Sequence, residues 1–431
     1  MIQVFNHPPK EQWNALLARP SFDAQSLLPK VEAIIKEVRQ NGDAALLAFT
    51  KEFDKVAMSS IVLDEKLKLA SEKALSSSLK AAIQLAKGNI EKFHLPQLQK
   101  MERIQTMPGV WCWRKSVGIE TVGMYIPGGT APLFSTVLML GVPAKMAGCK
   151  NIILCTPPNR QGEIHPAIIY AAALVGVTQI FTVGGVQAIA AMAYGTESIP
   201  KVNKIFGPGN QYVTAAKQWV QQAGVAIDMP AGPSEVCVWA DETANAHFVA
   251  ADLLSQAEHG VDSQVLLVAS NELLVAQVQE ALATQLEQLP RKEIATQALA
   301  NSKAIIMQNV NEALELINEY APEHLIMAID NAEIVAEKIV NAGSVFIGNY
   351  SPESVGDYAS GTNHSLPTNG YAHAYSGVSV DSFVKKITFQ QLTERGLVNI
   401  GNAVMEMAKS ESLEAHGNAV AIRLKEIESK M

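Results

Sequence analysis

Short apolar runs recur along the chain from about residue 150 onward, and segments with helical spacing separate most of them. The runs are residues 152–155, 180–183, 204–206, 236–239, 265–268, 304–307, 325–327 and 345–347. Continuous apolar runs between helices are typical of strands that are buried on both faces of a parallel sheet. The pattern therefore predicts an α/β fold.

A stretch rich in proline and glycine, residues 229–233, divides these runs into two series. Two series favour two similar sandwiched sheets over one long sheet. The chain has 431 residues, which is enough for about three domains.

The segments outside the two series are mostly helical in pattern. Four apolar residues near the N-terminus form a helical stripe: Val31, Ile34, Ile35 and Val38. This helix is expected to stop at Asn41 and Gly42, and residues 68–92 are again largely helical. Residues 110–113 indicate a strand. The tail from about Phe383 has helical spacing and is expected to be separate.

Composition and charge narrow the class of partner. The chain has 34 Lys plus Arg against 42 Asp plus Glu, and its formal net charge is -8. This balance argues against a nucleic-acid or anionic-membrane partner and favours a small-molecule substrate. The N-terminus lacks the pattern of a signal peptide, and no apolar run reaches the roughly 18 residues of a membrane span. We therefore expect a cytoplasmic protein.

The cysteines show no spacing typical of a metal site. They are Cys112, Cys149, Cys155 and Cys237. In a cytoplasmic chain they are expected to be reduced thiols. Cys149 is a candidate nucleophile for an aldehyde, but burial without a chemical role is common for cysteine.

The stretch from Ile227 to His259 carries the first sign of a metal site. It contains Ile-Asp-Met-Pro-Ala-Gly-Pro-Ser-Glu, a strand-like run and an alanine-rich helix. Along that helix, Asp252, Gln256 and His259 fall at i, i+4 and i+7 and form a polar stripe, and Gly260 is expected to cap its C-terminus. The stripe fits a metal site, and it also fits a satisfied core histidine beside a solvated glutamine.

Three glycine-rich loops lie where a predicted strand ends and a helix begins: residues 125–132, 183–187 and 206–212. Glycines let backbone N–H groups approach a phosphate, and a helix N-terminus adds partial positive charge. The third loop resembles the dinucleotide fingerprint without its last glycine, which is weak evidence alone. Together the loops favour a nucleotide site over a set of tight turns.

Three other segments carry candidate chemistry. Glu323 and His324 put a carboxylate beside an imidazole at the start of a predicted strand. The pair suits proton transfer, but only an irregular strand end lets both side chains serve one pocket, and a surface pair is the alternative. Residues 343–368 form a segment that is too long and polar for packing alone. In the tail, Glu411 and His416 are five residues apart and would not share one helix face.

Together these segments resemble the histidinol dehydrogenase family, whose members oxidise L-histidinol through the aldehyde to L-histidine with two NAD⁺, the last step of histidine biosynthesis. The resemblance spans nearly the whole chain. Its most specific block runs from Ile227 to His259, where Ile-Asp-x-x-Ala-Gly-Pro-Ser-Glu is followed by Asp-Leu-Leu-Ser-Gln-Ala-Glu-His. The Gly-Pro-Gly-Asn, Pro-Glu-His and Val-Gly-Asp-Tyr-x-Ser-Gly-Thr-Asn-His segments match in the same order. Ser412 and Gly417 replace a common glycine and a common alanine in the tail.

The resemblance implies roles for individual residues. It implies that His324 takes the alcohol proton and that Glu323 activates water to hydrate the aldehyde. It implies one zinc ion per subunit, which positions the substrate. The implied zinc ligands are Gln256, His259, Asp357 and His416. The implied substrate contacts are Ser234, Gln256, His259, His324, Asp357, Glu411 and His416. The implied contacts to NAD⁺ are Tyr125, Gln187 and Asn210, and His364 is a further pocket residue.

The resemblance also implies a fold. It consists of two incomplete Rossmann-like domains of the aldehyde-dehydrogenase-like kind, with small N- and C-terminal pieces exchanged across a homodimer. His416 would then reach the partner's zinc, so each active site would need both chains. The expected parts are an N-terminal arm (1–25), a first domain (26–118 with 235–377), a second domain (119–234) and a helical tail (378–431).

Three other functions use parts of the same inventory. A zinc-dependent hydrolase would use Glu323 to activate a metal-bound water, but it would leave the glycine-rich loops without a ligand. An aldehyde dehydrogenase acting through Cys149 would lose turnover in a Cys149→Ala variant. A metal-dependent binding protein would take up histidinol or zinc without reducing a cofactor.

Overall fold

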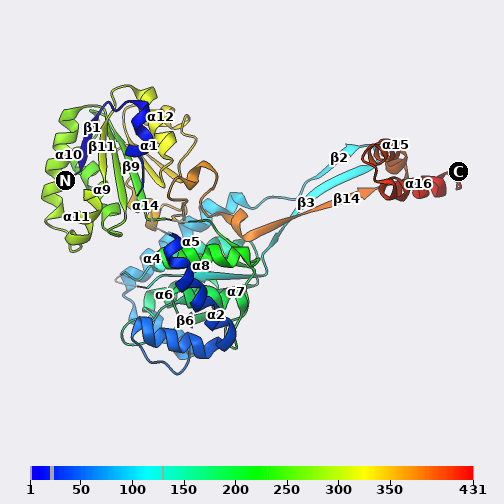
Figure 1. Cartoon of the computed structure of the whole chain (residues 1–431), viewed down its shortest axis with the longest axis horizontal. Coiled ribbons are helices and arrows are strands. Elements are labelled where there is room, and N and C mark those ends of the chain that lie inside the picture. Colours follow the sequence, from blue (N-terminus) through cyan, green and yellow to red (C-terminus); the bar gives the residue numbers. More distant parts are fainter. Residues whose placement is uncertain (1, 20–23, 129–130, 231, 431) are drawn as a thin grey trace. The chain divides into compact units, whose positions relative to one another are not determined.

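The computed structural model describes residues 2–19, 24–128, 131–230 and 232–430. The chain divides into two compact units (Figure 1). The first unit comprises Met1–Pro96 and Ile119–Phe383, and the second comprises Gln97–Gly118 and Val384–Met431. None of the described helices has both the length and the apolar character needed to cross a membrane.

The first unit contains a six-stranded sheet with the order β1-β11-β10-β9-β12-β13, and every pairing in it is parallel. Its strands are β1 (Gln3–Asn6), β9 (Glu235–Ala240), β10 (Gln264–Ala269), β11 (Lys303–Ile306), β12 (His324–Ala328) and β13 (Ser344–Ile347). All residues of β9, β10 and β12 are buried, as expected for continuous apolar runs. The direction in which strands are added reverses between β9 and β12, as in doubly wound sheets.

The first unit also contains a five-stranded parallel sheet with the order β6-β5-β4-β7-β8. Its strands are β4 (Thr121–Tyr125), β5 (Asn151–Thr156), β6 (Gln179–Thr182), β7 (Lys204–Phe206) and β8 (Ala226–Ile227). The order reverses between β4 and β7, at the position that corresponds to β9 and β12 in the other sheet. The prediction of two similar parallel sheets is therefore confirmed.

Helices cover both sheets. The helices that alternate with the strands of the five-stranded sheet are α5 (Phe134–Met146), α6 (Pro166–Val175), α7 (Gly185–Tyr194) and α8 (Gln211–Gln222). Those of the six-stranded sheet are α9 (Ala246–Ala257), α10 (Glu272–Leu286), α11 (Lys292–Ala300), α12 (Val310–Tyr320), α13 (Ala332–Ala336) and α14 (Glu353–Tyr358). Alternate residues of β9 enter different apolar clusters, Val236 and Val238 on one face and Cys237 and Trp239 on the other. Both faces of this sheet are therefore packed.

The N-terminal segment contributes α1 (Trp13–Leu16), α2 (Ala24–Phe49), α3 (Glu65–Ala74) and α4 (Ser77–His94). A kink at Gly42, whose φ is 48°, interrupts α2 where the sequence predicts a stop. In the structure, α2 packs against α7 and α8, and α4 packs against α5. In the first unit, α2 and α4 thus contact helices that alternate with the strands of the five-stranded sheet. The expected division into domains stays a prediction.

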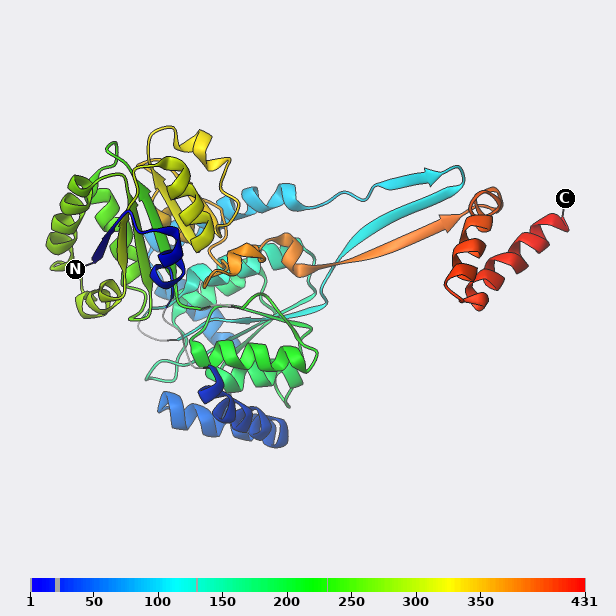
Figure 2. The ribbon, with the colours of Figure 1, turned by 45° about the horizontal axis from the view of Figure 1, so that its top comes forward.

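The second unit is a three-stranded antiparallel sheet and two helices. The sheet has the order β14-β3-β2, formed by β14 (Val384–Leu392), β3 (Val110–Gly118) and β2 (Arg103–Met107). The helices are α15 (Glu394–Ser410) and α16 (Glu414–Glu428), which pack side by side (Figure 2). Between them Ser412 has a φ of 58°, the left-handed region that favours glycine. The tail that was predicted to be helical thus begins with a strand, β14, and becomes helical only from α15 onward.

Candidate active site

The predicted acid–base pair lies at one edge of the six-stranded sheet. His324 is the first residue of β12, and β12 pairs in parallel with β9, which begins at Glu235. Glu323 immediately precedes β12, so the pair lies at an irregular strand end, as the sequence requires for a shared pocket. This is the amino edge of the sheet, whereas ligands of doubly wound sheets usually bind at the carboxyl edge.

The backbone of Glu235 contacts both members of the pair. Its N–H donates to Oε2 of Glu323 at 2.8 Å, and its carbonyl oxygen lies 3.1 Å from Nδ1 of His324. A carbonyl oxygen can only accept, so Nδ1 carries the hydrogen, and in the neutral ring Nε2 has a free lone pair. Glu323 and His324 are both buried, and Oε2 of Glu323 lies 3.6 Å from Nδ1.

Beside the pair lies a group of possible metal ligands. One ligand atom each from His259, Glu353 and Asp357 lies within 4.8 Å of the others. Glu353 and Asp357 are four residues apart on α14, so one helix face presents both. Oδ1 of Asp357 lies 3.5 Å from Nε2 of His324, and neither atom has a hydrogen-bond partner within the described part of the chain. Buried atoms without partners are rare, and a bound ion or ligand is one explanation.

Gln256 adjoins this group from α9. Its side chain is fully buried between Glu353 and Glu235. With the amide turned so that nitrogen faces the carboxylate, the nitrogen donates to Oε1 of Glu353 at 2.5 Å, and the oxygen accepts from the N–H of Glu235 at 3.0 Å. The amide therefore links the possible metal ligands to the start of β9.

His259 corrects one sequence prediction. The helix ends at Ala257 and Glu258 caps it, so His259 lies beyond α9 and Gly260 is not its cap. The N–H of His259 donates to the carbonyl of Gln256 at 3.2 Å in a tight turn. The polar stripe continues across this turn, and the exposed imidazole of His259 borders the cluster.

The electrostatics of the cluster favour a cation. Burial raises the pKa of Glu323 and of Glu353 to about 8. Burial lowers the pKa of His324, but the neighbouring carboxyl groups of Glu323 and Asp357 raise it by more, so that it lies at about 10. These shifts show that the carboxyl groups share a poorly solvated space with too little positive charge. Imidazole nitrogens with carboxylate and amide oxygens suit a borderline ion such as zinc, so the residues present fit that metal.

His364 supports the loop that follows α14. Its Nδ1 donates to the carbonyl oxygen of Asp357 at 2.9 Å, and its Nε2 lies 3.1 Å from the hydroxyl of Thr136. The amide of Asn363 donates to the carbonyl of Met139 on α5. Both ring nitrogens of His364 are thus engaged, and the residue anchors Asp357.

The three residues expected at the NAD⁺ site lie at the carboxyl ends of strands in the five-stranded sheet. Tyr125 ends β4, and its hydroxyl accepts from the N–H of Gly185 at 3.2 Å. Gln187 is buried in the first turn of α7, and its Oε1 has no partner among the described residues. Asn210 caps α8 through its side-chain oxygen. Gly129 and Thr130 of the first glycine-rich loop lie outside the described residues.

The third glycine-rich loop requires glycine at one position. Gly207 has a φ of 122°, and a Cβ added there would lie 2.0 Å from the carbonyl oxygen of Tyr125. The loop after β7 can therefore approach the end of β4, its neighbour in the sheet. The strand order reverses between these two strands, which is where doubly wound sheets bind their ligands.

The remaining predicted residues are distributed over both units. Ser234 is half-buried and immediately precedes β9. Glu411 caps the end of α15, and His416 lies on α16, so both belong to the second unit and both are exposed. The first unit brings together five of the predicted residues: Gln256, His259, Glu323, His324 and Asp357.

Nearly the whole chain matches one protein family. Residues 17–424 match the family described as histidinol dehydrogenase. The chain belongs to this family. It is 60% identical over 424 residues to the histidinol dehydrogenase of Bacteroides thetaiotaomicron, which covers 98% of this chain and 99% of the relative.

Other members of the histidinol dehydrogenase family agree. The chloroplastic histidinol dehydrogenase of Arabidopsis thaliana is 52% identical over 97% of this chain and 90% of its own length. The crystal structure of histidinol dehydrogenase from Elizabethkingia anophelis superimposes with a TM-score of 0.97, at 55% identity and 99% coverage of both chains. Histidinol dehydrogenases are NAD-dependent oxidoreductases, so this chain is an enzyme of that class.

Glu235, Glu353 and Arg19 are functional candidates that the sequence did not single out. Glu235 is a carboxylate at the start of an otherwise apolar strand, and Glu353 stands four residues before Asp357. Both features are visible in the sequence and could have drawn attention. No sequence signal marks Arg19, whose contact with Glu235 joins residues 216 positions apart.

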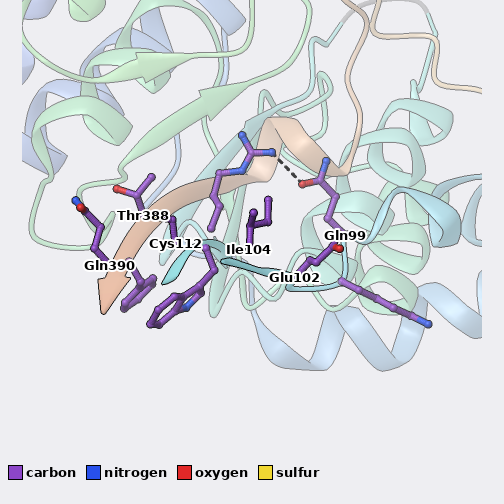
Figure 3. A pocket seen from close by; sticks show the side chains of 10 residues that line it. Gln99, Glu102, Ile104, Cys112, Thr388 and Gln390 are labelled. Atoms are coloured by element: carbon purple, nitrogen blue, oxygen red, sulfur yellow. Dashed lines mark hydrogen bonds between the residues drawn. The ribbon is translucent and has the colours of Figure 1, made fainter. Parts of the chain in front are cut away.

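Two other features lie outside this site. Burial raises the pKa of Cys149 to about 11, so its thiol is protonated at neutral pH, which disfavours a nucleophilic role. A pocket on the three-stranded sheet is lined by Gln99, Lys100, Glu102, Ile104, Cys112, Trp113, Arg114, Thr388, Phe389 and Gln390 (Figure 3). None of the predicted site residues lines this pocket.

Proposed function

We propose that the chain oxidises L-histidinol to L-histidine through L-histidinal, with two NAD⁺, as the last step of histidine biosynthesis. The observation that carries this proposal is the buried pair Glu323 and His324 beside the ligand cluster of His259, Glu353 and Asp357, in a chain of the histidinol dehydrogenase family. This four-electron oxidation needs a proton acceptor for the alcohol, a carboxylate that activates water and a cluster that binds a cation.

The metal proposed is one zinc ion per subunit, held by Gln256, His259, Asp357 and the partner subunit's His416. When bound, it would orient the imidazole and amino groups of the substrate. The unpartnered Oδ1 of Asp357 and the surplus of buried carboxyl groups support this assignment. Glu353 is positioned to orient the amide of Gln256.

In the first oxidation, His324 accepts the proton of the substrate hydroxyl at Nε2 while the carbon transfers a hydride to NAD⁺. The hydrogen bond from Nδ1 to the carbonyl of Glu235 keeps the lone pair on Nε2. The carboxyl groups of Glu323 and Asp357 lie 3.6 Å from Nδ1 and 3.5 Å from Nε2 of His324, where their negative charge would stabilise the imidazolium that forms. The products are the aldehyde, NADH and one proton.

In the second oxidation, Glu323 takes a proton from the water that adds to the aldehyde. Burial raises the pKa of Glu323 to about 8, so the ionised carboxylate, which dominates above this pH, is a stronger base than an exposed one. The hydrate then transfers a hydride to a second NAD⁺ and loses its two hydroxyl protons, which leaves the carboxylate of histidine. We further propose that Ser234 and Glu411 contact the substrate.

The cofactor is proposed to bind at Tyr125, Gln187 and Asn210. Their position at the carboxyl ends of β4, β6 and β7 supports this, as does the unpartnered Oε1 of Gln187. The protein is proposed to act in the cytoplasm as a homodimer with shared active sites. The location of Glu411 and His416 in a separate unit is consistent with exchange of that unit.

A Glu323→Gln variant tests the division of labour within the pair. The amide keeps the size of the side chain but cannot take a proton, so oxidation of L-histidinal should slow by about 10²- to 10⁴-fold. Oxidation of L-histidinol to the aldehyde should slow much less. Rates of NADH formation from each substrate, in single turnover, measure the two steps. Equal slowing of both would contradict the assignment of water activation to Glu323.

A further inference from the structure

The backbone of one residue, Glu235, contacts both members of the pair Glu323 and His324. The N–H of Glu235 donates to Glu323, and its carbonyl oxygen accepts from Nδ1 of His324. A shift of the Glu235 backbone would therefore move the water-activating carboxylate and would also weaken the hydrogen bond that fixes the imidazole tautomer. The position of Glu235 is thus important for both oxidations.

The side chain of Glu235 is held by a guanidinium from the N-terminal segment. Nε and Nη2 of Arg19 donate to Oε1 and Oε2 of Glu235 at 2.6 and 2.8 Å. The N–H of Asn369 also donates to Oε1, at 2.7 Å. Both charged side chains are well shielded, with exposed fractions of 14% for Arg19 and 2% for Glu235. Two parallel bonds between planar groups fix orientation as well as distance.

The same guanidinium holds the turn that leads into the pair. Nη2 of Arg19 donates to the carbonyl oxygen of Tyr320 at 2.6 Å and lies 3.4 Å from that of Ala321. The guanidinium also stacks on the ring of Tyr320, 4.1 Å from its centroid. Ala321 has a φ of 48°, an unfavourable conformation for alanine that needs support from its surroundings. Pro322 and the catalytic pair follow directly.

We infer that Arg19 is a positioning residue for the reaction: by joining Glu235 on β9 to the turn before β12, it holds Glu323 and His324 in register. The inference rests on the proposed function. Arginine suits the task because its planar fork can bind a carboxylate and a carbonyl together, whereas lysine offers a single charged point. Arg19 is outside hydrogen-bonding contact with Glu323 and His324, so it acts through Glu235 and the turn.

The test uses full-length, zinc-loaded protein with an Arg19→Ala substitution. The kcat of both oxidations should fall by about tenfold to a hundredfold, because small displacements of reacting groups carry costs of that size. The KM for L-histidinol should change by less than about threefold, because the substrate contacts are retained. Guanidinium at tens of millimolar should restore part of the kcat, since it can occupy the vacated site. Arg19→Lys should lie between wild type and Arg19→Ala.

Lys303→Met is the matched control. Nζ of Lys303 donates to the carbonyl oxygen of Leu16, so it anchors the same N-terminal segment without contacting β9 or the turn before Glu323. The kcat of Lys303→Met should stay close to that of the wild type and should not respond to guanidinium. If Lys303→Met loses as much kcat as Arg19→Ala, the effect is loosening of the segment and the inference fails.

The two proposals fail separately. Absence of NADH formation by zinc-loaded wild type would contradict the proposed function. An active wild type with an equally active Arg19→Ala, or a loss confined to KM without rescue by guanidinium, would overturn only the role of Arg19. Removing one partner of a buried pair is destabilising. If Arg19→Ala does not fold, as judged by circular dichroism, Arg19→Lys decides: a wild-type kcat overturns the inference and a reduced kcat with unchanged KM supports it.

Discussion

The imidazole of His259 has a different task from that of His324. It lies beyond the end of α9, is exposed, and belongs to the ligand cluster with Glu353 and Asp357. A His259→Ala variant removes one of the few proposed ligands, so zinc content and turnover should both be lost. Metal analysis of the purified variant, together with its rate of NADH formation, measures the two properties.

A second histidine provides the control for that variant. His247 lies in the first turn of the same helix, and its contacts are made by its backbone. His247→Ala should keep both zinc and activity. Retained zinc with normal turnover in His259→Ala would contradict the assignment of His259 as a ligand.

Asp54 gives the protein a pH-dependent stability away from the cluster. Burial raises its pKa from 3.8 to about 6, so the folded state disfavours the charged form. The resulting penalty is full above about pH 6 and disappears as the pH falls below the unfolded value, near 4. Asp54→Asn should therefore stabilise the protein at pH 8, by about 1 kcal/mol once partial solvent exposure is allowed for.

Urea unfolding at two pH values checks this prediction. The gain in unfolding free energy should be present at pH 8 and mostly lost at pH 4, because the wild-type carboxyl is then neutral in the folded protein and only about half ionised in the unfolded chain. A gain of equal size at both values would show that packing, and not ionisation, explains the effect.

At the scale of elements, apolar runs were sufficient to locate strands that are buried on both faces. Each of the eight predicted runs coincides with one strand, β5, β6, β7, β9, β10, β11, β12 or β13, and only Val183 and Met307 lie one residue beyond a strand end. The strands that the pattern missed include β14, whose sequence Val-Lys-Lys-Ile-Thr-Phe-Gln-Gln-Leu is largely exposed. Its register is set by pairing with β3, which lies far away in the sequence. Such a strand carries little local signal.

Helix ends depend on contacts that a periodic pattern does not contain. The polar stripe of Asp252, Gln256 and His259 predicted one helix through His259, but the turn after Ala257 ends it earlier. The stripe survives because the turn keeps His259 near the preceding face. The sequence therefore predicted that His259 lies near Gln256, but it did not predict where the helix ends.

The candidate site shows the same limit at the scale of the whole molecule. Motifs identified Gln256, His259, Glu323, His324 and Asp357, which the first unit brings together. Arg19 lies 216 positions from Glu235 and reaches the site through tertiary packing, so no motif contains it with its partner. Glu353 stands close to Asp357 on α14, but its contact with Gln256 on α9 also depends on tertiary packing. The roles proposed for Glu411 and His416 depend on a second chain, and they stay predictions.

The central claim is a four-electron oxidation, and the ratio of NADH formed to L-histidinol consumed tests it most directly. The ratio is measured by absorbance and chromatography, before and after treatment with a chelator and then zinc. We expect two NADH per L-histidinol, L-histidine as the product, loss of activity on chelation and its return with zinc. One NADH per L-histidinol with accumulation of the aldehyde, or no NADH from intact, zinc-loaded protein, would contradict the account.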